Sequence, residues 1–261
     1  MTLVIPRSSL TNRIVAMPRF SSSTLRIVLL AALVLGPLHS ALAQDRTREA
    51  RSVEAFTEVE FETPGTLHLR QGDAHSVEVE GPPKVLDRLV TEVDGEALEV
   101  RAEDDSGLFG LFDDTDLDSD EVDIYVTAPA IEEVGLAGSG RIEGKTRIES
   151  ESLSLSVAGS GDLDLEVATE QLEIGVAGSG DCTLRGRADA LTTKTAGSGD
   201  IKASKMKTCT AEVDIVGSGD AELHVTDRLD ARILGSGDVQ YRGQPEVELS
   251  SLGSGTVSSI E

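Results

Sequence analysis

The tripeptide Gly-Ser-Gly occurs seven times in the second half of this 261-residue chain, and successive copies are 18 to 21 residues apart. An aspartate directly follows five of the seven copies. A unit of this length is too short for a strand and a full crossover helix, so it predicts one coil of a β-solenoid per repeat. The predicted turn glycines are Gly138, Gly140, Gly159, Gly161, Gly178, Gly180, Gly197, Gly199, Gly217, Gly219, Gly235, Gly237, Gly253 and Gly255.

The residues before each turn alternate between apolar and polar, as Leu172, Ile174 and Val176 do before the turn at 178–180. This alternation is typical of a half-buried strand. The pattern predicts an all-β fold, a right-handed parallel β-helix in which each coil pairs in register with the next. The glycines would allow sharp bends with positive φ, and the following aspartate would cap its own turn as an Asx turn.

The sequence predicts four segments, of which the first, residues 1–43, is described in the next paragraph. Residues 131–261 form the regular coils, and 52–130 form irregular coils that cap the amino-terminal end, so that 52–261 is one continuous domain. A separate small β domain at 52–130 is the alternative. Residues 44–51 are a short linker. Candidate strands in the irregular part are 53–61, 66–70, 76–80, 97–102 and 122–127, with a short helical stretch within 82–93.

The first 43 residues have the pattern of a secretory signal peptide, with Met17 as the expected true start. Arg19 and Arg26 precede a 12-residue apolar run, and the small residues Ala41 and Ala43 suit cleavage. The run is short for a membrane span, although a retained anchor is the alternative. We therefore expect an exported protein, periplasmic or secreted, whose mature chain has no transmembrane anchor. In such a compartment a Cys182–Cys209 disulfide is permitted, and the sequence leaves it open.

Charge excludes some partners. The chain has 47 Asp and Glu against 23 Lys and Arg, and removal of a leader with four Arg and no acid lowers the net charge from −24 to −28. Such acidity repels nucleic acid, so no nucleic-acid partner is expected. Within the acidic segment 103–121, the apolar residues Leu108, Phe109, Leu111 and Phe112 are either a tip folded onto the solenoid or a contact loop for another subunit or a partner.

The sequence singles out no catalytic or cofactor-binding residue. His68, His75 and His224 lack metal-ligand spacing and are expected at the surface without partners. The aspartates after the turns could form a Ca²⁺-binding ladder, or they could cap turns without metal. These residues are Asp162, Asp181, Asp200, Asp220 and Asp238.

The recurring aliphatic-Ala-Gly-Ser-Gly-Asp string resembles the family called "putative auto-transporter adhesin, head GIN domain", as does the segment Val122–Pro129. The resemblance covers roughly residues 52–258. It implies an exported, mostly bacterial β-helix and suggests adhesion, but it carries over no catalytic residue. We therefore expect a non-enzymatic protein of the bacterial cell envelope, either an adhesin-like binder or a self-assembling scaffold. Its partners would be an envelope component, a glycan, a protein or further copies of itself. A polysaccharide-active enzyme and a Ca²⁺-binding solenoid remain the alternatives.

Overall fold

The computed structural model describes residues 46–103 and 122–260, which belong to one compact unit. The predicted signal peptide at 1–43, including Met17, lies outside the described residues. So does the predicted contact loop of Leu108, Phe109, Leu111 and Phe112.

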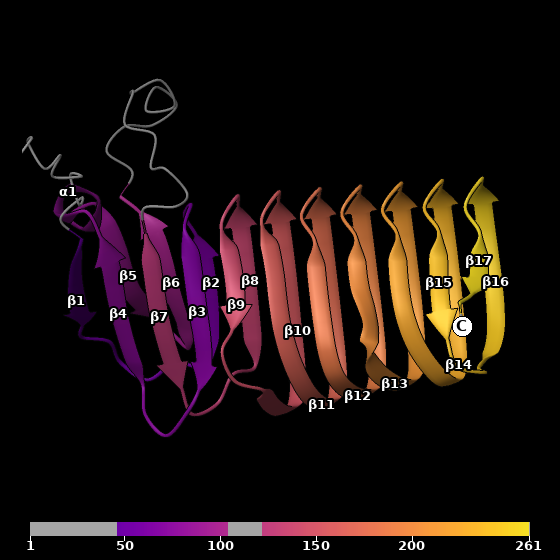
Figure 1. Ribbon diagram of the computed structural model, residues 1–261, viewed down its shortest axis with the longest axis horizontal. Coiled ribbons are helices and arrows are strands. Elements are labelled where there is room, and N and C mark those ends of the chain that lie inside the picture. The colour runs from indigo at the N-terminus through magenta and orange to yellow at the C-terminus, as the bar shows by residue number, and fades with distance from the viewer. Residues whose placement is uncertain (1–45, 104–121, 261) are drawn as a thin grey trace, which may run out of the picture. The chain divides into compact units, whose positions relative to one another are not determined.

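Seventeen strands and one short helix make up the described part of the chain, and hydrogen bonds join all the strands into one continuous sheet. The strands lie side by side along the unit and wind around a common core (Figure 1). The elements before the repeats are β1 (Thr47–Arg51), β2 (Glu58–Glu62), β3 (Thr66–Gln71), β4 (Ser76–Gly81), α1 (Pro83–Leu86), β5 (Leu89–Asp94), β6 (Ala97–Ala102) and β7 (Asp123–Ala128). Those of the repeats are β8 (Glu133–Gly138), β9 (Arg141–Gly144), β10 (Ile148–Gly159), β11 (Asp162–Gly178), β12 (Cys182–Gly197), β13 (Ile201–Gly217), β14 (Ala221–Gly235), β15 (Val239–Arg242), β16 (Glu246–Gly253) and β17 (Val257–Ser259).

The repeats form the predicted solenoid. Equivalent strands of successive coils pair in parallel, and the turns are in register, so that Gly159 pairs with Gly178 and Gly178 with Gly197. The inward side chains of each strand stack on those of the next coil. The β-solenoid fold predicted from the repeat is therefore confirmed.

The corners between successive turns are part of the strands. Strands β11 to β14 are each 15 to 17 residues long and run from one Gly-Ser-Gly turn to the next. The backbone keeps its pairing with the neighbouring coil through the corner, so the strand bends instead of ending. Differences in coil length appear as local shifts of register, for example between Lys202 and Lys207.

The amino-terminal part is less regular because it mixes strand directions. β2 and β3 pair in parallel with neighbouring strands, whereas β1 and β5 are antiparallel to β4 and β6. The five strands predicted here all overlap observed strands, and α1 lies within the predicted helical stretch. Residues 47–51 were predicted to belong to a linker, but they form β1, because their backbone pairs with that of β4.

Within residues 46–103 and 122–260, the core is a column of aliphatic side chains that is closed at one end only. Near the amino-terminal end Phe56 and Leu86 are each 1% exposed. In the last coil, Val247 and Leu249 occupy inward positions but are 37% and 46% exposed. The two ends of the solenoid therefore present different surfaces.

Candidate functional site

One outward position, the residue directly before each Gly-Ser-Gly turn, forms a continuous apolar row along the solenoid. The strand alternation points this side chain to solvent, and the in-register pairing places it beside its equivalent in the next coil. We call this set the apolar row. Its members are Ala137, Ala158, Ala177, Ala196, Val216, Leu234 and Leu252.

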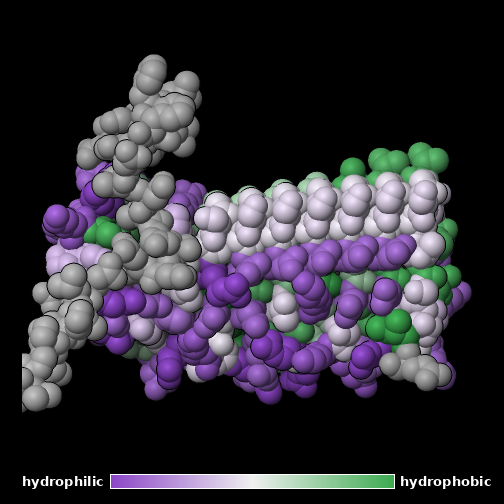
Figure 2. Space-filling view, turned by 45° about the horizontal axis from the view of Figure 1, so that its top comes forward, coloured by the Kyte–Doolittle hydropathy of each residue, from purple (hydrophilic) through white to green (hydrophobic). Residues whose placement is uncertain are grey.

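The side chains of the apolar row grow larger toward the carboxyl-terminal end. Four alanines are followed by Val216, Leu234 and Leu252, which are 53%, 50% and 74% exposed. Figure 2 shows hydrophobic residues, in green, gathered at that end beside the row of white residues that runs along the molecule. Single exposed apolar residues are ordinary, but a contiguous set marks an interaction surface.

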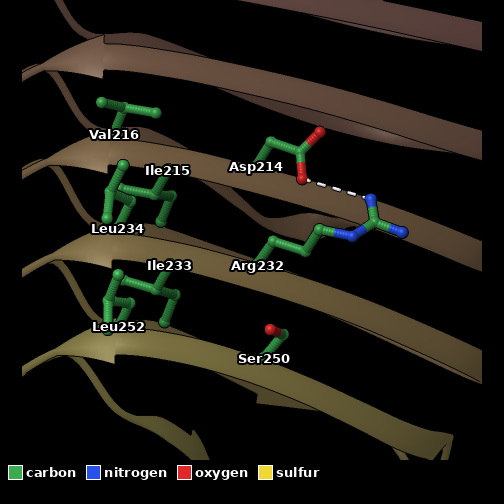
Figure 3. A pocket seen from close by; sticks show the side chains of 8 residues that line it. All are labelled: Asp214, Ile215, Val216, Arg232, Ile233, Leu234, Ser250 and Leu252. Carbon is green, nitrogen blue, oxygen red and sulfur yellow. Dashed lines mark hydrogen bonds and ion pairs between the residues drawn. The ribbon is translucent and has the colours of Figure 1, made fainter.

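Two shallow hollows adjoin the apolar row. One has a volume of about 530 Å³ and is lined by Ala158, Ala177 and Ala196 together with small and polar neighbours. The other has a volume of about 370 Å³, and both Leu234 and Leu252 line it (Figure 3). Because the hollows are open, they suit contact with an extended surface better than enclosure of a small molecule.

Charged side chains lie on the strand positions beside the apolar row and bind one another. Arg232 contacts Asp214 at 3.3 Å (Figure 3). It also pairs with Glu212. Lys194 donates to Glu173 at 2.6 Å, and this hydrogen bond raises the pKa of the lysine. The cations beside the apolar row are thus paired with carboxylates of the same face.

The prediction that the aspartates after the turns form Asx turns requires hydrogen bonds within each turn. The aspartates instead form hydrogen bonds to the next coil. The Oδ1 atom of Asp181 accepts the backbone N–H of Asp200 at 3.1 Å, and Asp200 accepts that of Asp220 at 3.0 Å. Asp220 accepts the N–H of Asp238 at 2.7 Å. The carboxylate reaches the next coil because equivalent turns are adjacent in the sheet. Each of these bonds fastens one turn to its successor.

Further donors relieve the repulsion between stacked carboxylates. Arg141 donates to Asp162, and Lys202 donates to Asp181, both at 2.5 Å. At the far end, the hydroxyl and the backbone N–H of Thr256 both donate to Asp238 at 2.8 Å, and they lower the pKa of that carboxyl group. Among residues 46–103 and 122–260, no group of three or more His, Cys, Asp or Glu side chains is arranged to hold a metal ion.

The two glycines of each turn have different roles. The first has positive φ in all seven turns, from +93° at Gly138 to +141° at Gly253, as predicted. The second has no positive φ, but a Cβ at Gly140 would lie 2.6 Å from a ring atom of Phe61. From the second turn onward, a Cβ at either glycine would meet the backbone of the preceding coil.

Two of the three histidines considered as metal ligands, His68 and His75, have partners, so the expectation of unpartnered surface histidines is wrong for them. The Nε2 atom of His68 lies 2.8 Å from Asp123 Oδ1, and its ring stacks on Tyr125. His75 Nε2 lies 2.9 Å from the backbone oxygen of Phe56. Both belong to the irregular amino-terminal coils, where the repeat gave no register from which to predict these contacts.

The cysteines do not form a disulfide in this structure. Both thiols are free, because Cys182 points into the core while Cys209 is exposed. Burial, with a smaller effect of nearby aspartates, raises the pKa of the Cys182 thiol to about 12.

The apolar row was missed in the sequence, although a signal for it is present. The residue before each turn reads Ala, Ala, Ala, Ala, Val, Leu, Leu in chain order. Its outward direction follows only once the strand alternation is combined with the stacking of the coils. None of the helices in the described segments has the length and apolar character that crossing a bilayer demands.

Comparisons with known proteins agree with this architecture. A "putative adhesin" from Bacteroides fragilis superposes with a TM-score of 0.74 at 20% identity, covering 84% of this chain and 98% of the other. A "putative lipid binding protein" from Parabacteroides distasonis gives 0.68 at 24% identity, with coverage of 83% and 97%. A "putative adhesin" from the same species gives 0.62 at 20%, with coverage of 84% and 98%. No curated protein matches the chain significantly. A family profile matches residues 55–245, so the chain belongs to the family "Putative auto-transporter adhesin, head GIN domain".

Proposed function

We propose that this protein is an exported, non-enzymatic binding protein of the bacterial envelope, adhesin-like in function, whose apolar row is the docking surface. Membership of the adhesin family supports the binding role, and two of the similar structures are named as adhesins. The leader-like pattern of residues 1–43 supports export. The observation that carries the proposal is the exposure of Val216, Leu234 and Leu252 side by side on one face.

The charges of this face restrict the ligand. The carboxylates that flank the apolar row, among them Glu173, Glu212 and Glu248, are each paired with a lysine or arginine, so the negative excess comes from the chain as a whole, whose net charge is −24. Such a surface attracts positive charge and repels negative charge. We therefore propose a protein ligand whose apolar side chains are accompanied by lysine or arginine.

A pair of synthetic peptides tests this assignment. Fluorescence anisotropy would measure binding of an extended peptide of alternating Leu and Lys, and of a Leu and Glu peptide of equal length. We expect the basic peptide to bind and the acidic one not to bind. Leu234→Lys should weaken binding at least tenfold, because it places a charge between the large exposed side chains of Val216 and Leu252. Leu249→Lys is the matched control, since Leu249 is similarly exposed at 46% but lies outside the apolar row. Equal affinity of the wild-type chain and the Leu234→Lys variant would refute the assignment.

A neutral lipid is the second candidate ligand. The large exposed side chains of Leu234 and Leu252 favour it, and one similar structure is named as a lipid-binding protein. Flotation with phosphatidylcholine vesicles would detect this activity. Binding to these vesicles that is lost in Leu234→Lys, without binding to the basic peptide, would favour the lipid over the protein ligand.

A further inference from the structure

The last coil of the solenoid has an uncovered face. Among the described residues, β16 pairs only with β14, and β17 only with β15, so the outer edge of each strand is free. The inward residues Val247 and Leu249 stack on Leu229 and Ala231 of the preceding coil. Those partners are 0% and 2% exposed, whereas Val247 and Leu249 are 37% and 46% exposed. The last coil therefore presents core side chains and unpaired backbone to solvent.

The opposite end is protected in the ways that isolated sheet edges usually are. Its edge strands are β1 and β5, and both carry charged side chains: Arg48 of β1 pairs with Glu78, and Glu92 of β5 pairs with Arg101, each at 2.5 Å. Phe56 and Leu86 close the core there and are almost completely buried. Charges on an edge strand discourage further pairing. End-to-end association is therefore favoured at the carboxyl-terminal end and disfavoured at the amino-terminal end.

The chemistry of the uncovered face matches the coils of this chain. Inside the solenoid, each such face is covered by strands that pair along their length and by aliphatic side chains that continue the core. What fits the last coil is thus another coil with the same cross-section. A second copy of the chain provides one in its own last coil.

Two copies related by a two-fold axis would bring β16 against β16 in antiparallel pairing. A register centred on Leu249 places Val247 opposite Ser251 and Glu248 opposite Ser250. Glu248 then avoids its own copy, and its carboxylate stays bound to Arg228, which donates to it at 3.1 Å. The charges of this strand are compatible with the symmetric pairing.

We infer that the last coil is a dimer interface, through which two copies of this chain join tail to tail into one longer solenoid. The interface uses the inward side chains of β16, whereas the apolar row lies on the outward face and meets this strand only at Leu252. Because the amino-terminal ends are closed, assembly stops at two copies.

Size-exclusion chromatography with light scattering of the full chain tests the oligomeric state. We expect twice the chain mass at micromolar concentration. Leu249→Lys should give the mass of one chain, because it places two charges against each other at the two-fold axis. Leu234→Lys is the matched control and should remain dimeric while it loses peptide binding. A monomeric wild-type chain would overturn the inference and leave the last coil to a different partner. Masses above a dimer, or a dimeric Leu249→Lys variant, would also overturn it.

Cross-linking tests the interface without relying on how the lysine variant folds. In a Cys209→Ser background, Leu249→Cys should form an intermolecular disulfide on oxidation, because the two-fold axis brings the two residues opposite each other. Leu234→Cys should not form one under the same conditions. Equal cross-linking of both variants, or none with Leu249→Cys, would contradict the register.

Discussion

Substitution of Gly197 by alanine tests whether the turns hold the solenoid together. Gly197 has φ of +134°, a conformation that is essentially restricted to glycine and costs another residue about 1–3 kcal/mol. A Cβ there would also lie 3.0 Å from the carbonyl carbon of Gly178 and 3.1 Å from its nitrogen, and closer still to its oxygen. Carbon atoms in contact are normally about 3.5–4.0 Å apart, so the stacked turns would have to separate.

Substitutions at two other glycines separate the contribution of backbone strain from that of the steric clash. Gly138 has φ of +93°, but a Cβ there would meet nothing within 4 Å, so Gly138→Ala adds backbone strain without a clash. Gly175 lies in a strand without positive φ and also has open space around it. Gly175→Ala should therefore stabilise the fold slightly, by about 0.5 kcal/mol, because it restricts the unfolded chain.

The expected order can be stated for thermal unfolding followed by circular dichroism. Strain and overlap together cost Gly197→Ala about 4 kcal/mol, against about 2 kcal/mol for Gly138→Ala. For a chain of this size each kcal/mol shifts the Tm by about 2–4 °C. We expect a fall of about 8–16 °C for Gly197→Ala, a fall of about 4–8 °C for Gly138→Ala, and a rise of about 1–2 °C for Gly175→Ala. Equal shifts for Gly197→Ala and Gly138→Ala would refute the argument from stacked turns.

Three further predictions concern polar groups. The hydroxyl of Thr193 is buried without a hydrogen-bond partner, so Thr193→Val should raise stability by about 1 kcal/mol in urea unfolding, whereas Thr208→Val should lower it because that hydroxyl donates a hydrogen bond. Burial and four neighbouring glutamates raise the pKa of Glu60, so the charged carboxylate destabilises the fold and Glu60→Gln should raise the Tm at pH 7. This gain should disappear below the pKa that Glu60 has in the unfolded chain, near pH 4, because the carboxyl group is then neutral in both states. A gain in Tm that persists there would exclude the electrostatic cause. Millimolar Ca²⁺ should leave the Tm unchanged, since the Oδ1 atom of Asp238 is already bound by two donors of Thr256, and a clear rise in Tm would restore the Ca²⁺ ladder.

Much of the fold could be predicted from the sequence because the repeat encodes long-range pairing directly. Once the turns at Gly159 and Gly178 are equivalent, the register of every residue between them follows. The amino-terminal strands carry no repeat, so their existence could be predicted from alternation, but the antiparallel direction of β1 and β5 could not.

The candidate site could be predicted less well. The role of Asp200 was assigned from its own turn, where an Asx turn is the common local solution. In the structure its carboxylate instead binds the backbone of Asp220, twenty residues later, because that atom is adjacent in space. The apolar row could not be found from neighbours in the sequence, because its members are neighbours only across successive coils. The increase in side-chain size from Ala158 to Leu252 therefore becomes visible only along the solenoid.

The uniform pairing of the coils makes the chain extendable. Each coil from β11 to β14 pairs with the coils before and after it, and its turn is fastened to the next by the same contacts. Duplication of one repeat would therefore lengthen the molecule by one strand spacing, about 4.8 Å, without disturbing either end. Recombination between its own repeats would therefore change the length of the solenoid in steps of one coil.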